Sequence, residues 1–216
     1  MATFTLTARG PFSLAASTRF LEGFAPAEYT AAADQPLELA FPVEGSWRTA
    51  GVRVRASRPG VTGEILSPAD PPRELAQAIK AQVARILSLD VDGSGFPAVG
   101  ERDPVVAGLQ RRYPGLRPVG FWSPYEAAAW AIIGQRIRIR QAAAVKARMA
   151  AELGAPVVFG DHTVHAFPAA TVSPRLDLDT SMADSGGPLG YAGEVRVGGL
   201  GGLAPEASAV PAARGR

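Results

Sequence analysis

The sequence has no cysteine and no long apolar run. The absence of cysteine excludes disulfide scaffolds, zinc–thiolate sites, iron–sulfur clusters and a cysteine nucleophile. The longest uninterrupted apolar run covers residues 127–133, far short of the roughly 18 residues that span a bilayer. The first twenty residues alternate in polarity and lack the continuous apolar stretch of a secretory signal. We therefore expect a soluble, cytoplasmic protein with no membrane partner.

Charged residues are scarce, at 19% of the 216 residues, and they are unevenly distributed. Residues 101–150 hold nine basic and three acidic side chains, a net charge of +6, whereas the rest of the chain carries −4. A basic block inside a nearly neutral protein favours a polyanionic partner, of which nucleic acid is the commonest.

The first part of the chain predicts an α+β domain over residues 1–88. Apolar residues alternate with period two at 3–7, 37–43, 52–57 and 61–66, which indicates strands of an antiparallel sheet. Helical spacing at 13–21 and after Pro71-Pro72 indicates two helices on one face of that sheet. Arg53 and Arg55 are expected to point from their strand toward water.

Residues 89–102 are rich in Gly, Asp and Pro and predict a linker, after which residues 103–169 read as a helical region. Asp103 followed by proline is typical of a helix start. Ser123 and Glu126 form a capping box in which the glutamate reaches back to the helix start. A second helix is expected over 141–153. From residue 170 onward 25 of 47 residues are Gly, Pro, Ala or Ser, which predicts a disordered tail.

The strongest local charge pattern is the alternation of arginine and isoleucine over residues 136–140. One interpretation is a strand or helix face with the isoleucines inward and solvated arginines outward. The other follows from its place at a helix–helix junction opened by Gly134, where arginines and free backbone amides can grip phosphates.

Two metal-binding alternatives have weaker support. Asp90, Asp92, Ser94 and Glu101 fit the ligand spacing of a calcium loop, but proline occupies the eighth position and no second loop is found. Two histidines, His162 and His165, could bind a metal together with Asp161, but no motif supplies a third ligand. The alternative is that they are exposed residues of a loop. We expect no metal and no cofactor, and keep a calcium-binding module as a third class of function.

The segments 103–118 and 123–137, with the helix end Ile-Ile-Gly-Gln at 132–135 and Phe167-Pro168 further on, resemble DNA-3-methyladenine glycosylase II, the AlkA-type branch of the helix-hairpin-helix glycosylases. The likeness covers about residues 3–169. It implies a TATA-binding-protein-like sheet domain followed by a helical glycosylase domain. It also implies a role in base-excision repair, in which alkylated purines are released from double-stranded DNA.

The resemblance also assigns roles to residues. Gln135 lies in the loop that meets the DNA lesion, and Arg136 occupies the position of the wedge residue, which is often apolar in the family. Ile137, Arg138 and Arg140 extend the DNA-binding segment. Phe20 matches an aromatic residue of the family that approaches the base pocket.

The likeness ends near residue 170. The family continues with a helix-hairpin-helix and a catalytic aspartate, whereas Asp177, Asp179 and Asp184 follow no such hairpin. Our hypothesis is a truncation or a reading-frame shift, so that the helical domain is incomplete and the chain does not excise bases. The alternative function is a non-catalytic DNA-binding remnant or regulatory module. The oligomeric state is not predicted.

Overall fold

The computed structural model describes residues 2–24, 26, 35–67 and 69–170, which belong to a compact unit that spans Met1–Val172. The residues from 171 onward lie outside the described residues, and so do the expected tail and its three aspartates. None of the described helices combines the length and the hydropathy that a membrane crossing requires.

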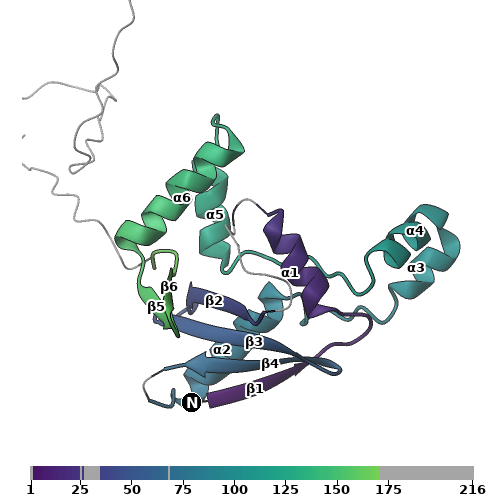
Figure 1. Ribbon diagram of the computed structural model, residues 1–216, viewed down its shortest axis with the longest axis horizontal. Coiled ribbons are helices and arrows are strands. Elements are labelled where there is room, and N and C mark those ends of the chain that lie inside the picture. The colour runs from purple at the N-terminus through teal and green to yellow at the C-terminus, as the bar shows by residue number, and fades with distance from the viewer. Residues whose placement is uncertain (1, 25, 27–34, 68, 171–216) are drawn as a thin grey trace, which may run out of the picture. The chain divides into compact units, whose positions relative to one another are not determined.

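A four-stranded antiparallel sheet forms the first part of the described chain (Figure 1). Its spatial order is β1-β4-β3-β2, so that β1 and β2 are the edge strands. The four expected strands are confirmed, and Pro42 ends β2 at the sheet edge, where a missing N–H is tolerated. The strand bounds are β1 Ala2–Thr7, β2 Leu37–Pro42, β3 Thr49–Ser57 and β4 Gly60–Leu66.

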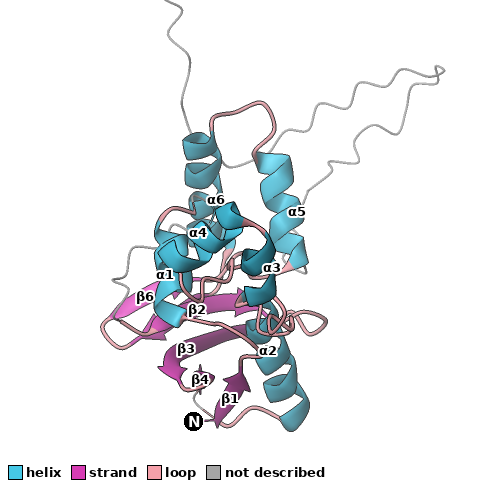
Figure 2. Ribbon diagram, turned by 90° about the vertical axis from the view of Figure 1, so that its right-hand side faces the viewer, coloured by secondary structure: helices cyan, strands magenta, loops and turns pink. Residues whose placement is uncertain are grey.

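One face of the sheet packs in a single hydrophobic core with helices α1 (Leu14–Glu22) and α2 (Arg73–Ile86). Figure 2 shows α2 lying along the sheet. Buried Gln82 of α2 donates hydrogen bonds to the carbonyls of Pro42 at 3.1 Å and Trp122 at 2.8 Å. One amide thus joins the helix, an edge strand and the segment that leads to the later helices. Large side chains of this core are Leu21, Leu37, Leu39, Phe41, Ile79 and Ile86.

The other face of the sheet carries a charged ladder across three strands. Arg53 of β3 lies 3.0 Å from the Glu38 carboxylate on β2 and 3.8 Å from that of Glu64 on β4. The Arg53 side chain is only 21% exposed, so its expected position in water is wrong. Cross-strand pairing reduces the exposure of Arg53, and the sequence of one strand does not show this pairing. The ring of Phe159, whose centre lies 5.9 Å from the guanidinium carbon, also covers the side chain. Arg55 does reach solvent, at 55% exposed.

A two-stranded hairpin covers part of that face, with β5 (Pro156–Phe159) antiparallel to β6 (His162–His165). The expected loop around the histidines is therefore wrong. The strands are joined by two residues, and Gly160 takes the left-handed φ of +69° that such turns require. Phe159 is buried in a small cluster with Ala40 and Ala166. Gly51 on the sheet makes room for the hairpin, because a Cβ there would collide with the Val157 side chain.

We expect protonated His162 to hold this hairpin on the sheet. Its Nδ1 lies 3.3 Å from the Asp161 carboxylate and its Nε2 2.7 Å from that of Glu38. Hydrogen bonding, first to Asp161 and then to Glu38, raises the pKa of His162. The stabilisation is therefore complete below the unfolded pKa of about 6.5 and is lost as the pH rises through the higher folded pKa. His162→Gln should lower the denaturation midpoint more at about pH 5.5 than at about pH 8.5.

The matched control for this experiment is His165→Gln, on the same short strand, whose side chain forms no ion pair among the described residues. At about pH 5.5 its effect on the midpoint should be smaller than that of His162→Gln. An equal loss of stability for His162→Gln at both pH values would contradict the assignment.

The stretch 89–102, expected as a linker, contains a helix of its own, α3 (Pro97–Arg102). Helix α4 (Pro104–Arg112) follows and begins as predicted, because the Asp103 carboxylate accepts hydrogen bonds from the amides of Val105 at 2.8 Å and Val106 at 3.2 Å. Neither helix has a buried residue.

Candidate nucleic-acid interface

Helices α5 (Pro124–Ile133) and α6 (Ile139–Leu153) form a helical hairpin joined by residues 134–138. The Ser123 hydroxyl caps α5 as predicted, by accepting a hydrogen bond from the Glu126 amide at 3.0 Å. The helix ends at Gly134. Helix α6 begins two residues before the expected position, because the Gln141 side chain accepts a hydrogen bond from the Arg138 amide at 3.1 Å and extends the helix start.

The connection turns at Arg136, which has a φ of +59°. A non-glycine residue in this left-handed region costs about 1–3 kcal/mol, and such residues cluster at functional sites. A glycine here would relieve the strain. The arginine side chain therefore occupies a position where the backbone favours glycine. We call residues 134–140 the tip of the hairpin.

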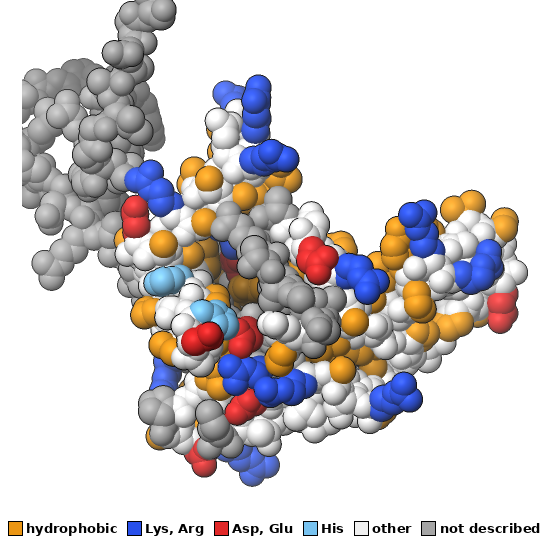
Figure 3. Space-filling view, in the orientation of Figure 1, with side chains coloured by type: hydrophobic (Ala, Val, Ile, Leu, Met, Phe, Trp, Pro, Cys, Tyr) orange, Lys and Arg blue, Asp and Glu red, His pale blue; other side chains and the backbone are white. Residues whose placement is uncertain are grey.

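Every side chain from Gln135 to Arg140 is exposed. Ile137 is 42% and Ile139 60% exposed, so the interpretation with inward isoleucines is wrong. The cause is that no described element covers this end of the hairpin. Among the described residues Arg136, Arg138 and Arg140 form no ion pair. Figure 3 shows Lys and Arg side chains gathered at this end, with hydrophobic atoms beside them.

The tip combines two groups that bind polyanions. The first turn of α6 presents amides without intrahelical partners and the positive end of the helix dipole, which favour phosphate. The three arginines add donors that match phosphate oxygens in pairs. Exposed isoleucines between them are the kind of apolar side chain that enters a minor groove and unstacks bases.

A buried ion pair fixes the base of the same hairpin. Glu126 of α5 is 3% exposed, and its Oε1 lies 2.7 Å from the Nζ of Lys146 on α6. This long-range pair takes the place of the reach-back that the capping box predicts. The Lys146 ammonium also lies 5.5 Å from the ring centre of Phe167. Burial raises the pKa of Glu126, and Lys146 acts in the opposite direction.

Phe20 lies on α1, away from the tip, and is half-buried. Its ring stacks on Phe24 at 5.6 Å between centres, and Phe24 meets the edge of Phe121 at 5.4 Å. Phe20 therefore belongs to a row of aromatic side chains at the rim of the core. Its assignment to a base pocket stays a prediction.

No group of three or more histidine, aspartate or glutamate side chains within the described ranges could hold a metal ion. In the candidate calcium loop, Asp92 instead accepts hydrogen bonds from the amide of Ser94 at 2.9 Å and its hydroxyl at 2.6 Å. These two bonds lower the pKa of Asp92, the hydroxyl contributing most. The loop is thus closed by its own side chains.

No known protein family's sequence profile matches the chain, and no curated protein matches it in sequence. The fold is similar to that of 3-methyladenine DNA-glycosylase from Archaeoglobus fulgidus, with a TM-score of 0.59 and 17% identity over 78% of this chain and 56% of that chain. A structure of MBOgg1 in complex with low affinity DNA ligand gives a TM-score of only 0.41, with 18% identity over 62% of this chain and 44% of that chain. The chain thus shares the fold of part of a DNA glycosylase and spans 56% of its length.

Proposed function

We propose that this chain binds duplex DNA through the tip of the α5–α6 hairpin. The observation that carries the proposal is the set of exposed arginines, free of ion pairs among the described residues, at the start of a helix. In this assignment Arg138 and Arg140 bind phosphates, while Gln135, Arg136 and Ile137 face the lesion. Phosphate contacts fix the position on the duplex, and the lesion-facing residues distinguish damaged from normal DNA.

We further propose that the chain derives from an AlkA-type glycosylase that acts on alkylated purines. The likeness of fold to a 3-methyladenine DNA glycosylase supports this, together with the Ile-Ile-Gly-Gln sequence, which ends α5 and leads into the tip. Residues 1–88 would then be the amino-terminal, TATA-binding-protein-like sheet domain, and residues 103–169 part of the helical glycosylase domain.

We also propose that the 216-residue chain does not excise bases. Cleavage of a glycosidic bond builds positive charge on the sugar, which a nearby carboxylate stabilises. Segments 103–118 and 123–137, which carry the resemblance, contain two carboxylates, and both have other roles. Asp103 caps α4, and Glu126 is buried against Lys146. A base must also be extruded and held in a pocket before it is cleaved.

The purified chain should therefore release no 3-methyladenine from alkylated DNA above the spontaneous rate, while it still binds that DNA. A full-length AlkA-type enzyme is the positive control. Release that disappears when one of Asp177, Asp179 or Asp184 is changed to asparagine would contradict the proposal. Binding without release would favour the non-catalytic DNA-binding module over the enzyme.

A further inference from the structure

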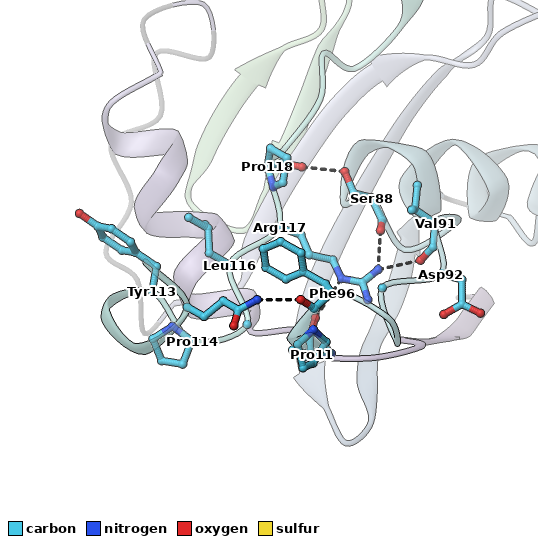
Figure 4. A pocket seen from close by; sticks show the side chains of 14 residues that line it. Pro11, Ser88, Val91, Asp92, Phe96, Tyr113, Pro114, Leu116, Arg117 and Pro118 are labelled. Carbon is cyan, nitrogen blue, oxygen red and sulfur yellow. Dashed lines mark hydrogen bonds between the residues drawn. The ribbon is translucent and has the colours of Figure 1, made fainter. Parts of the chain in front are cut away.

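A cavity of about 630 Å³ lies outside the tip, among the loop after α2, the start of α3 and the turn after α4. Its size falls within the range of small-molecule sites, about 300–1,000 Å³. Figure 4 shows the Arg117 guanidinium beside the Phe96 ring, with Leu116 and Tyr113 along one side. Most of its remaining walls are proline and glycine, so the cavity is largely apolar.

Arg117 is 7% exposed and holds the cavity in shape. Its guanidinium donates to backbone carbonyls of Pro11 at 3.0 Å, Ser88 at 2.7 Å and Val91 at 2.9 Å, and to that of Arg9. Two segments, residues 9–11 and 88–91, therefore meet at one side chain from a third segment, which means that the cavity is preformed. A preformed site loses little free energy to ordering when a ligand binds.

The same four bonds leave the site with an unsatisfied donor. A guanidinium has five N–H groups. Arg117 uses one on Nε, two on Nη1 and one on Nη2, so one Nη2 N–H has no hydrogen-bond partner among the described residues. All four acceptors are neutral carbonyls, so no anion in the described part of the chain is hydrogen-bonded to Arg117.

Asp92 is the one other charged residue of the lining, and the positive charges of Arg9 and Arg117 both help to lower its pKa, after the hydrogen bonds from Ser94. It lies 3.5 Å from the Arg9 guanidinium and accepts both hydrogen bonds from Ser94. Figure 4 shows its carboxylate pointing away from Arg117 and the Phe96 ring. Arg9, next to the lining, and Arg117 together carry two positive charges against the one negative charge of Asp92, which leaves this group of three with a net charge of +1.

The apolar walls also present ring surface to a ligand. Phe96 is 50% and Tyr113 46% exposed, although both line the cavity. Gln110 fixes the Phe96 backbone by donating to its carbonyl at 2.7 Å, and the Arg112 guanidinium lies 5.5 Å from the Tyr113 ring centre. The rim thus offers stable aromatic surface with a further cation nearby.

We propose that this cavity binds a small aromatic acid. The carboxylate of the acid accepts a hydrogen bond from the free Nη2 N–H of Arg117. Its ring lies against Phe96, Leu116 and Tyr113. The inference is independent of DNA binding, because no residue of the cavity belongs to the tip.

Three ligands of one shape and different charge test the proposal by titration calorimetry on the full chain: 4-phenylbutanoate, 4-phenylbutanol and 4-phenylbutylammonium. The acid should bind about tenfold more tightly than the alcohol, since a hydrogen bond to a charged group adds roughly that much, and the amine most weakly. Equal affinities, tightest binding of the amine or no binding of the acid would overturn the proposal.

Two variants of the lining and one control variant locate the binding. Leu116→Trp fills the cavity and should abolish binding of the acid, whereas Val105→Trp, at an exposed position of α4 outside the cavity, should leave it unchanged. Phe96→Leu removes an exposed ring without touching the core and should weaken binding even if Leu116→Trp fails to fold. Unchanged affinity in a folded Leu116→Trp variant, or in Phe96→Leu, would refute the location.

Discussion

Replacing Arg138 and Arg140 together by glutamate is expected to weaken duplex-DNA binding about a hundredfold at low salt. Each charge-assisted bond to a phosphate contributes about tenfold in affinity, and glutamate adds repulsion. The loss of two phosphate contacts should flatten the slope of log affinity against log salt by about 1.8. Fluorescence anisotropy of a labelled duplex over a series of salt concentrations measures both quantities.

The control is the double variant Arg111→Glu/Arg112→Glu. These two arginines belong to the same basic block and lie in the last turn of α4, away from the tip (Figure 1). The change in net charge is identical, so a general electrostatic effect would weaken binding equally in both variants. An equal loss of affinity and of slope would show that net charge, and not the tip, binds DNA.

The second large effect is expected at the base of the hairpin, where Lys146→Met should destabilise the fold by about 3–5 kcal/mol. The substitution leaves the Glu126 carboxylate buried without its partner, because the two side chains are 4% and 12% exposed. The double variant Glu126→Leu/Lys146→Met removes both charges and should recover most of the loss. Urea unfolding followed by circular dichroism gives the free energies.

The pH dependence separates a buried charge from lost packing. Burial already raises the pKa of Glu126 above its ordinary value, and loss of the Lys146 ammonium should raise it further. Folding then favours the protonated acid, so the penalty is fully present above the folded pKa and vanishes below the unfolded value of about 4.3. The difference in the free energy of unfolding between Lys146→Met and the natural chain should therefore become smaller as the pH falls from neutral.

Arg148→Met provides the matched control on the same helix. Arg148 pairs with Glu152 one turn away, but both side chains are more than half exposed. Its loss should cost at most about 0.5 kcal/mol, as for other surface pairs at this spacing. If Lys146→Met cost no more than Arg148→Met, the buried pair would contribute nothing to the hairpin.

Local patterns predicted the elements well, because their causes lie within a few residues. The period-two strands and the caps at Ser123 and Asp103 all appear where the sequence places them. The β5–β6 hairpin was missed although its signal is local: Val157 to Phe159 precede a two-residue Gly-Asp turn. Four-residue strands are too short for a clear period.

Contacts between distant segments were not predictable from the sequence. Nothing near Glu126 in the sequence indicates Lys146, and nothing near Arg53 fixes the register that places it between two carboxylates. The position of the tip followed from Gly134, but the exposure of Ile137 depends on which elements pack around the hairpin. The cavity at Arg117 is built from residues around position 11, from 88–97 and from 110–118, and had no sequence signal.

The place of the β5–β6 hairpin in the chain has a consequence for synthesis. All four strands of the sheet lie within the first 66 residues, whereas the hairpin that covers part of their outer face begins at Pro156. At roughly 5–20 residues per second, a ribosome leaves that face uncovered for on the order of 5–20 s. The ladder of Glu38, Arg53 and Glu64 lies on this face, and inward-facing charge discourages pairing between nascent sheets. During synthesis the ladder thus protects the uncovered face from pairing with other sheets, and in the finished fold it contacts the hairpin.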